Sequence, residues 1–430
     1  MTTELKGKTQ KQNTLLKPMD GASDQPWVQA LRETGAEVFN ETGLPTPAWE
    51  DWKYTSLRAF ADQGFRHLSS ASSIVDVADL PQKFVSKSLR IVFVNGRFQQ
   101  ALSDDIDGIE FYSLAKDQAD WMRDYLVNIG DLALKPFKAL NTAGFEDGAV
   151  IRVSKEVKID LPVEILFYNQ GCEDCAPAFY PRNLFMVEDG AELSLIEHHT
   201  GKGIYFANHM TEIVVKADAK LNHYRLQNES LEATHISTVS LTQFKKSVFE
   251  SVALTLGAKL SVIDVNSKLI EESSSCTLKT SYAMLGGQHC NHTIKIDHFE
   301  PDCKSDQMFR GIIDGQACAV FQGKIHVCRN AQGTDGRQSH HALLLSETAE
   351  VFAKPELEIY ADDVKCTHGA TAGQLDEDAL FYLRTRGIPE AEARSLLIQS
   401  FLNDVIQDIM DDDIRDAYVQ RMDQVLGENR

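Results

Sequence analysis

Short apolar runs separated by glycine, aspartate and asparagine fill the middle of the chain, from residue 149 to about residue 364. The clearest are AVIRV, VEILFY, NLFMVEDGAELSLIEHH, SVALTLGAKLSVIDVNSKL and HTIKIDHF. No amphipathic segment of helical length, about 10 to 15 residues, interrupts them, which argues against alternating strand and helix units. The middle of the chain is therefore predicted to consist of β-strands.

A weak repeat runs through these strands. Gly190-Ala-Glu-Leu, Asp218-Ala-Lys-Leu and Gly257-Ala-Lys-Leu each lie between two apolar runs, and further glycines follow at 286 and 315, giving spacings of 28, 39, 29 and 29 residues. Near-regular turns of this length are typical of a solenoid, in which each repeat packs on its neighbours. An antiparallel sandwich is the alternative, although about 215 residues is long for that fold.

The region before the strands, residues 1–148, is predicted to be mostly helical with one strand hairpin. LRIVFVNGRFQQ, residues 89–100, has two β-forming runs joined by Asn-Gly, which is a strong hairpin signal. GLPTPAWEDWKYTSL, residues 43–57, has two prolines and two tryptophans and predicts a rigid turn held by aromatic side chains. The polar stretch 1–25 is expected to fray.

The chain ends in three predicted helices. Asp376 can cap the first helix and Gly387 can end it, while Pro389 begins the second and a third spans 414–426. Short connections predict an antiparallel bundle. The strand-rich core is accordingly assigned to residues 149–372 and a helical domain to 373–430.

The second of these helices has a broad apolar stripe. It is formed by Leu396, Leu397, Phe401 and Val405. Because the stripe is wider than a lone helix can bury, we expect it to be shared between internal packing and a partner protein.

Cys366 and His368 lie where the last predicted strand approaches the helices. Two residues apart on an extended backbone, their side chains point to the same side of the sheet. A thiolate and an imidazole are suitable donors to iron or zinc, but a metal usually needs four, so a second chain would have to complete the set. The alternative is a buried cysteine beside a surface histidine.

Charge and cysteine usage narrow the classes of partner and compartment. The chain has 43 basic and 63 acidic residues, a net charge of −20, which opposes binding to nucleic acid or to anionic membranes. There is no apolar run of about 18 residues, and the polar start has no signal-peptide core. We therefore expect a cytoplasmic protein whose eight cysteines are reduced thiols.

Other possible sites are weaker. The CxxC pair Cys172 and Cys175 has no second pair at zinc-site spacing. The adjacent histidines His198-His199 and His340-His341 diverge on a strand, which argues against chelation by either pair alone. Four further cysteines are expected to be small core residues in β segments: Cys290, Cys303, Cys318 and Cys328.

Sequence motifs for catalysis are missing. Gly7-Lys8-Thr9 resembles the end of a phosphate loop, but the position of the required earlier glycine is Thr2. There is no GxSxG, HExxH or dinucleotide fingerprint either. We expect no nucleotide hydrolysis, and no other catalysis, from this chain alone.

Four stretches together resemble the SufB/SufD family of iron–sulfur cluster assembly proteins. They are GLPTPAWEDWKYTSL, IVFVNGRFQQALSD, the run from RNAQGTDGRQSHH to CTHGATAG, and DEDALFYLRTRGIP. The resemblance spans the whole chain. The CTHGATAG form, residues 366–373, is similar to the SufD branch, since SufB has a different sequence there.

The resemblance implies a mainly β fold, a right-handed parallel β-helix flanked by N-terminal and C-terminal helical domains. It implies a non-catalytic scaffold subunit of a SufBCD complex, paired with SufB through the end of the β-helix and driven by the SufC ATPase bound to the C-terminal helices. Cys366 and His368 would then contribute to a nascent cluster, or to iron, at the SufB interface. We expect this cluster or iron to be transient in the complex and none to be tightly bound to the isolated chain; a role in iron acquisition is also open.

Two other functions remain as alternatives. A carbohydrate-active β-helix enzyme would need acidic residues clustered in a groove, for which Asp302, Asp306 and Asp314 are the available set. A homodimeric structural protein is the second alternative, because an exposed β-helix edge can pair with its own copy.

Overall fold

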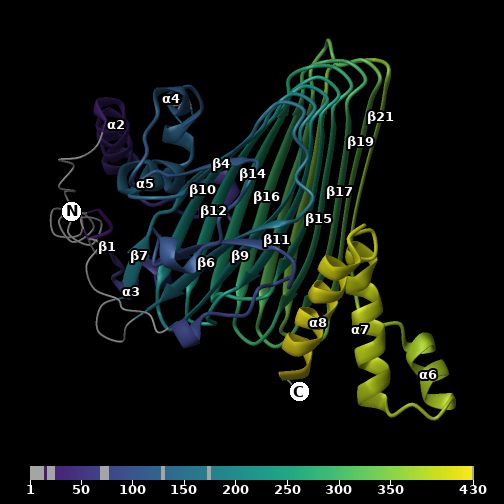
Figure 1. Ribbon diagram of the computed structural model, residues 1–430. Coiled ribbons are helices and arrows are strands. Elements are labelled where there is room, and N and C mark those ends of the chain that lie inside the picture. The colour runs from purple at the N-terminus through teal and green to yellow at the C-terminus, as the bar shows by residue number, and fades with distance from the viewer. Residues whose placement is uncertain (1–13, 17–24, 68–76, 127–130, 172–175, 429–430) are drawn as a thin grey trace.

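The computed structural model describes residues 14–16, 25–67, 77–126, 131–171 and 176–428. Its centre is a parallel β-solenoid of about seven turns, each of which contributes one strand to each of two sheets (Figure 1). Every solenoid strand pairs in parallel with the strand one turn away, as in the full registers of β10 with β12 and of β11 with β13. The solenoid prediction is confirmed, and the antiparallel sandwich is wrong.

The strands of each sheet follow in spatial order. The first sheet contains β4 (Ile109–Ser113), β5 (Ala149–Val153), β8 (Arg182–Val187), β10 (Phe206–Val215), β12 (Thr234–Gln243), β14 (Leu260–Leu269), β16 (His289–His298), β18 (Cys318–Val327) and β20 (Glu350–Ile359), with β1 (Arg66–His67) and β7 (Pro177–Phe179) beside it. The second sheet contains β3 (Arg97–Phe98), β2 (Leu89–Val94), β6 (Val163–Gln170), β9 (Glu192–Lys202), β11 (Lys220–Asn228), β13 (Val248–Thr255), β15 (Ser275–Met284), β17 (Lys304–Ile313), β19 (Thr334–Leu344) and β21 (Val364–Gly373).

Two series of turns explain the uneven spacing of the sequence repeat. On turns from the first sheet to the second, a residue with positive φ recurs every 27 to 29 residues, at 190, 218, 246, 273 and 302. On the opposite turns, positive-φ residues stand at 203, 258, 286 and 315. The interval of 39 residues in the sequence repeat, from Asp218 to Gly257, runs from a turn of the first series to a turn of the second. Because a left-handed backbone disfavours L side chains, glycine, aspartate and other small or polar residues recur at these corners.

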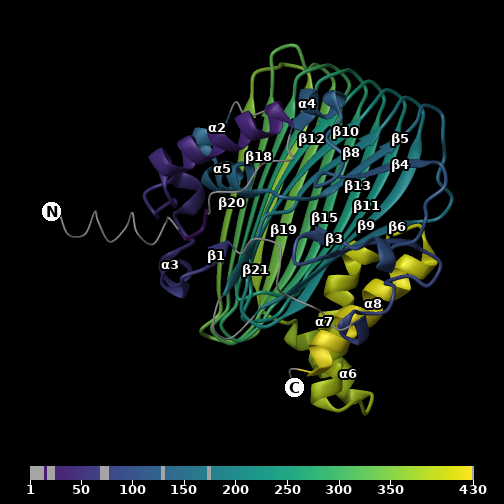
Figure 2. The ribbon, with the colours of Figure 1, turned by 60° about the vertical axis from the view of Figure 1, so that its left-hand side comes forward.

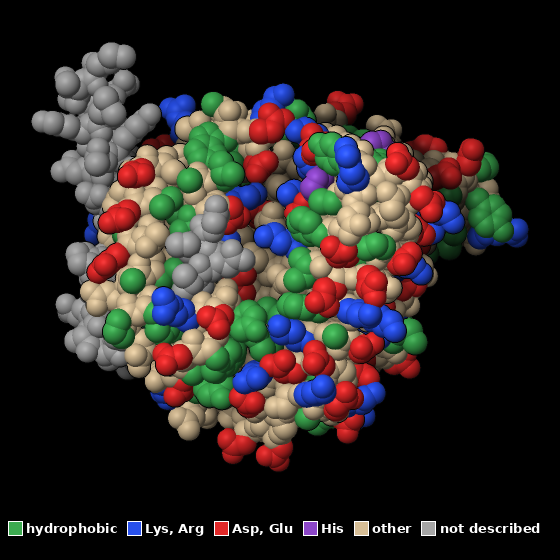
Figure 3. All heavy atoms as spheres, turned by 90° about the horizontal axis from the view of Figure 1, so that it is seen from above, with side chains coloured by type: hydrophobic (Ala, Val, Ile, Leu, Met, Phe, Trp, Pro, Cys, Tyr) green, Lys and Arg blue, Asp and Glu red, His purple; other side chains and the backbone are tan. Residues whose placement is uncertain are grey.

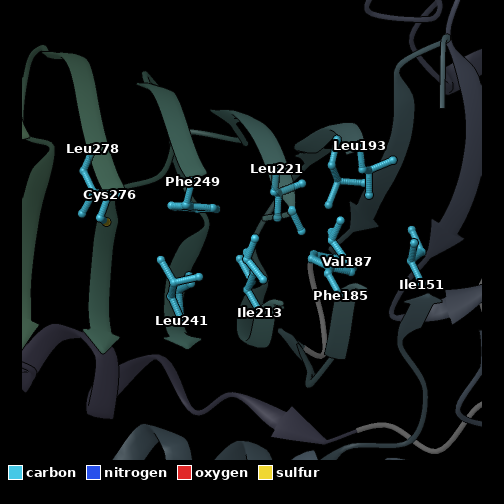
Figure 4. Close-up of a cluster of buried hydrophobic side chains, with 14 of the residues drawn as sticks. Ile151, Phe185, Val187, Leu193, Ile213, Leu221, Leu241, Phe249, Cys276 and Leu278 are labelled. Carbon is cyan, nitrogen blue, oxygen red and sulfur yellow. The ribbon is translucent and has the colours of Figure 1, made fainter. Parts of the chain in front are cut away.

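Inside the solenoid, alternate side chains of the two sheets face one another in ladders (Figure 4). One ladder aligns Leu193, Leu221 and Phe249 on successive strands of the second sheet. Ile213 and Leu241 are aligned on the first sheet and belong to the same buried cluster. These apolar ladders fill the early turns, where adjacent parallel strands place identical strand positions above each other.

The N-terminal helices cover the outer face of the first sheet (Figure 2). They are α2 (Pro26–Thr42), α3 (Arg58–Gln63), α4 (Asp120–Leu126) and α5 (Pro136–Gly144), with the 3-10 turns η1 (Glu50–Trp52) and η4 (Leu132–Leu134). Two further 3-10 turns of this region are η2 (Val77–Asp79) and η3 (Gln100–Leu102), of which η3 contacts β2 of the second sheet. The predicted aromatic turn is held as expected: Trp52 lies 5.3 Å from Phe137, and Tyr54 stacks on Phe352 at 4.5 Å. Helices α2 and α5 also pack closely on each other.

The predicted hairpin is present, with Asn95 and Gly96 both at positive φ between β2 and β3. Strand β2 also pairs in parallel with β6, so the hairpin is the first rung of the second sheet. Phe98 of β3 and Phe111 of β4 pack against the interior cluster. Strands therefore close this end of the solenoid.

The three C-terminal helices are α6 (Glu377–Thr385), α7 (Glu390–Ile406) and α8 (Asp412–Glu428). Asp376 caps α6 as predicted, accepting from two backbone N–H groups, and Gly387 has φ 87°. They do not form a self-contained bundle, because α7 packs on β15 and β17 and Tyr418 of α8 donates to the Val252 carbonyl at 3.1 Å. These helices cover apolar side chains on the outer face of the second sheet, and the second half of β21 remains exposed.

Candidate functional site

Cys366 and His368 lie on β21, the last strand of the second sheet, at the right-hand side of the solenoid in Figure 1. Cys366 is opposite Gly336 of β19, and His368 is opposite Gln338. Gln338 is buried and belongs to the inward face of β19. The two side chains therefore share one face of the strand, as predicted, and that face continues the solenoid interior at its last rung.

Cys366 is half-buried against the apolar cluster that contains Ile325 and Val327. The opposing residue is a glycine, and a Cβ at Gly336 would lie 3.4 Å from the Cys366 sulfur, so the glycine leaves room for the thiol. Burial raises the pKa of Cys366, outweighing the hydrogen bond from the Gly336 backbone. At neutral pH this group is therefore mainly a thiol, and binding a metal would have to displace its proton.

His368, in contrast, is exposed. Among the described residues, the only group of three or more metal-ligating side chains with converging donor atoms lies elsewhere, so Cys366 and His368 have no third ligand beside them. The pair offers one sulfur and one nitrogen donor toward the open end. Further donors would have to come from outside this chain.

The outer edge of β21 is the end of its sheet. The strand pairs with β19 on one side and is the terminal member of the sheet order. Its second half, Gly369–Gly373, consists of small exposed residues. A ten-residue edge of this kind presents backbone N–H and C=O groups to another strand, with little side-chain obstruction.

The predicted apolar stripe of α7 is divided between the interior and the surface. Val405 is fully buried and Leu396 is 42% exposed, while Leu397 and Phe401 are partly buried against the cluster beneath the helix. Arg310 of β17 lies over the Phe401 ring at 5.9 Å. In this structure Leu396 is the most accessible of the four for a partner, and Val405 serves internal packing.

Helix α6 exposes two aromatic side chains, whereas the sequence pattern predicts that Phe381 lines one apolar face with Leu380 and Leu383. Phe381 is 68% exposed and Tyr382 is 57% exposed, whereas Leu380 is buried. Phe381 therefore does not share the inner face with Leu380. Two adjacent aromatic residues on a short helix can indicate a binding surface, but only when it is known which face of the helix is buried.

The two histidine pairs diverge as predicted. His198 points outward and its Nδ1 lies 3.1 Å from Glu164, whereas His199 faces the interior. His340 is buried and its Nε2 lies 2.9 Å from the Tyr282 hydroxyl, while His341 contacts Thr371. Neither pair can hold a metal between its two members.

The other cysteines are free thiols where the structure describes them. Cys290 and Cys318 lie in strands, but Cys303 and Cys328 fall in the turns just outside β17 and β18, which corrects the expectation for those two. Burial raises the pKa of Cys290 above its usual range and that of Cys318 to about 11. Cys172, Cys175 and the stretch Gly7-Lys8-Thr9 lie outside the described residues.

The acidic residues of the carbohydrate alternative do not form a groove. Asp302 and Asp314 lie in turns at opposite ends of β17. Asp306 lies within that strand. No pair of them is positioned as a catalytic pair of carboxylates.

Sequence reasoning missed a group of three buried histidines, His199, His209 and His235. They come from three strands and have no common spacing. They meet because each occupies an inward-facing position of its strand and because successive turns stack on one another. No local motif could therefore have indicated them.

The surface has mixed charge. Figure 3 shows acidic and basic side chains interspersed, with small hydrophobic patches between them, on the face seen from above. None of the helices in the described part of the chain is long and apolar enough to cross a lipid bilayer.

Comparison with known proteins adds independent information. The family description "SUF system FeS cluster assembly, SufBD core domain" matches residues 168–401, and "SufBD protein N-terminal region" matches residues 19–165. The chain is 32% identical over 400 residues to an iron–sulfur cluster assembly SufBD family protein of Synechocystis, covering 88% of this chain and 86% of the relative. It is 30% identical over 391 residues to the iron–sulfur cluster assembly protein SufD of Escherichia coli, covering 90% of each. It is also 31% identical over 405 residues to the chloroplastic protein ABCI7 of Arabidopsis thaliana, covering 90% of this chain and 84% of the relative.

Proposed function

We propose that this chain, which belongs to the SufBD family of iron–sulfur cluster assembly proteins, is a non-catalytic scaffold subunit that pairs with a SufB-type protein through β21. A nascent cluster, as the cargo of the assembly, is held at the shared end of the two solenoids. A SufC-type ATPase binds the C-terminal helices and drives the cycle.

The observation that carries this proposal is the unpaired edge of β21, with Cys366 and His368 on its inward face. A second solenoid docked against this edge continues the sheet through backbone hydrogen bonds. Docking also brings the partner's side chains to the interior face where the thiol and imidazole lie. The partner then supplies the remaining ligands, since this chain offers only two donors.

The chemistry at this end is ligand exchange with loss of a proton. Cys366 enters as a thiol, gives up its proton when its sulfur binds iron, and is stabilised as the thiolate by the metal. His368 supplies an imidazole that either binds iron or accepts that proton. Partial burial of Cys366 protects the thiol from other reactions until the partner is in place.

The ATPase is assigned to the exposed aromatic surface of α6 and to Leu396 of α7. Helix α7 is linked to the second sheet, where Asp404 lies 3.2 Å from Arg310 of β17. A force applied to α6 and α7 by the ATPase would therefore reach the strands whose last member is β21. This connection is a physical route for coupling nucleotide hydrolysis to the assembly site.

The test replaces Cys366 and His368 separately with alanine and co-expresses each variant with SufB-type and SufC-type partners. Thr367→Ala is the matched control, because Thr367 lies between the two and points to the other face of the strand. The complex should assemble with an unchanged melting temperature, while iron and sulfide content should fall for Cys366→Ala and His368→Ala and stay normal for Thr367→Ala.

Two outcomes would contradict the proposal. Normal iron and sulfide content with both residues replaced would return the pair to a buried cysteine beside a surface histidine. A melting temperature that falls with the cluster content would make their role structural. Native mass spectrometry of the same samples separates the SufB-type heterodimer from the homodimer, which the same edge could form.

A further inference from the structure

Three histidines converge inside the early turns of the solenoid. His199 comes from β9 of the second sheet, and His209 and His235 come from β10 and β12 of the first. Each is at most 1% exposed, and one ring nitrogen from each lies within 4.8 Å of the others. Their ring centroids are 4.5, 5.1 and 5.2 Å apart.

The ring nitrogens of two of these residues lack hydrogen-bond partners. Neither Nδ1 nor Nε2 of His209 or of His199 is hydrogen-bonded, and the nearest carboxylate oxygen of Glu197 lies 4.0 Å from His199 Nε2. Buried polar atoms are satisfied in the great majority of cases, so several unsatisfied nitrogens in one place call for a common explanation. A metal ion bound by the rings provides that explanation.

The surroundings of the three rings contain two carboxylates and one guanidinium. Glu229 Oε2 lies 2.7 Å from His235 Nδ1, and Glu197 Oε2 lies 3.1 Å from Nε2 of the neighbouring His223. Arg225 Nη2 lies 2.6 Å from His235 Nε2. Counting the imidazoles as neutral, these groups leave one negative charge, which a bound cation would balance.

We propose that His199, His209 and His235 bind one divalent transition-metal ion of the borderline class, Zn²⁺ or Fe²⁺, in the interior of the solenoid. The proposal goes beyond the assembly function and does not depend on it. Imidazole is a preferred ligand of these ions, and three histidines leave a fourth position for water or a carboxylate.

Metal binding requires the three ring nitrogens to move closer together. With metal–nitrogen bonds of about 2.1 Å, tetrahedral ligands place their nitrogens about 3.4 Å apart, somewhat closer than the 4.8 Å limit found here. Rotation of the rings about their side-chain bonds can supply that difference. Glu229 Oε2 lies close enough to His235 Nδ1 to orient that ring once the two atoms are aligned as a hydrogen bond, which leaves Nε2 for the metal.

Binding through His235 Nε2 would require Arg225 to leave that nitrogen. Both Glu197 and Glu229 are near enough to attract the released guanidinium, since each acts electrostatically on Arg225. The protonation states also suit a metal site. Burial lowers the pKa of His199 to about 4 and also lowers the pKa of His209, so both rings are neutral at pH 7 and have lone pairs to donate.

The site is separate from the end of the solenoid. Strands β9 to β12 form its early turns, whereas Cys366 and His368 lie on β21, the last strand. Because the three histidines are buried, the ion would be incorporated as the solenoid folds and would exchange slowly. This inference opposes the sequence-based expectation that the isolated chain holds no tightly bound metal.

The experiment uses the full chain without a polyhistidine tag, in a Cys366→Ala, His368→Ala background that removes the proposed interface donors. The protein is produced with added Zn²⁺, or anaerobically with Fe²⁺, washed with chelator, and analysed for metal by mass spectrometry. The ligand variant is His199→Gln with His209→Gln. The matched control is His292→Gln, another buried interior histidine outside the group.

We expect about one ion per background chain, at least about tenfold less in the ligand variant, and no loss in the control. X-ray absorption of the metal in the background protein should show histidine scattering, which tests the site even if the ligand variant does not fold. The proposal would be overturned if the background chain held less than about a tenth of an ion both after production with Zn²⁺ and after production with Fe²⁺. Absence of histidine scattering, or equal metal in the folded ligand variant and the control, would do the same.

Discussion

Replacing Leu402 with alanine should loosen the C-terminal helices from the solenoid. Leu402 is fully buried on the inner side of α7, in the cluster that includes Leu254 and Ile312 of the second sheet. Its carbonyl also accepts a hydrogen bond from Ser281 at 2.8 Å. The side chain therefore lies at the contact that attaches the helix to the strands.

The magnitude follows from the cavity left behind. Buried leucine-to-alanine changes destabilise proteins by about 2 to 5 kcal/mol, and full burial leaves little room for relaxation here. A loss of about 3 kcal/mol would raise the undocked population of α7 more than a hundredfold, since each 1.4 kcal/mol is about tenfold. The effect should be local to the helices and to the strands beneath them.

Hydrogen exchange read by mass spectrometry would detect this change. Peptides from α7, α8 and the covered strands β15 and β17 should exchange faster in Leu402→Ala, while β10 and β12, under the N-terminal helices, should not change. Leu396→Ala is the control on the same helix: it is 42% exposed, so we expect a stability change within about 0.5 kcal/mol and, instead, weaker binding of a SufC-type ATPase. Unchanged exchange in Leu402→Ala would refute the docking argument.

Three further predictions concern the solenoid itself. A Cβ at Gly311 would lie 1.8 Å from the Tyr282 ring, so Gly311→Ala should lower the free energy of unfolding, measured in urea, by about 1 to 3 kcal/mol. Gly373→Ala is the control and should leave it unchanged, because a Cβ there would have nothing within 4 Å. Burial lowers the pKa of His292 to about 3 and that of His298 to about 4. Because both values lie below the ordinary histidine pKa of about 6.5, the unfolded state binds more protons than the folded state below that pH. The free energy of unfolding should therefore fall as the pH falls from about 6.5 toward 4, by about 1.4 kcal/mol per pH unit for each histidine. His298→Gln should make this pH dependence shallower in urea titrations, and an identical slope would show that the buried imidazole does not contribute. Thiol titration in denaturant without reductant should find eight free thiols, and finding none would contradict the reduced state expected of these cysteines.

The sequence by itself determined the local structure of this protein. The strand runs, the Asn-Gly hairpin and the cap at Asp376 follow from residue preferences within a few positions, and the structure has each of them. The shared face of Cys366 and His368 likewise needs only the two-residue period of a strand. The family resemblance added the assembly function that no local pattern contains.

The tertiary structure decided which surfaces are covered and which distant residues meet. The helices cover the faces of the solenoid because each sheet has an apolar outer side, so Val405 became buried while Leu396 and Phe381 remained exposed. The three interior histidines meet because successive turns stack in register and two sheets face each other across the interior, and residues separated by tens of positions carry no mark of that contact. Local preferences act over one turn of helix or a few strand residues, whereas stacking and covering depend on the whole folded chain.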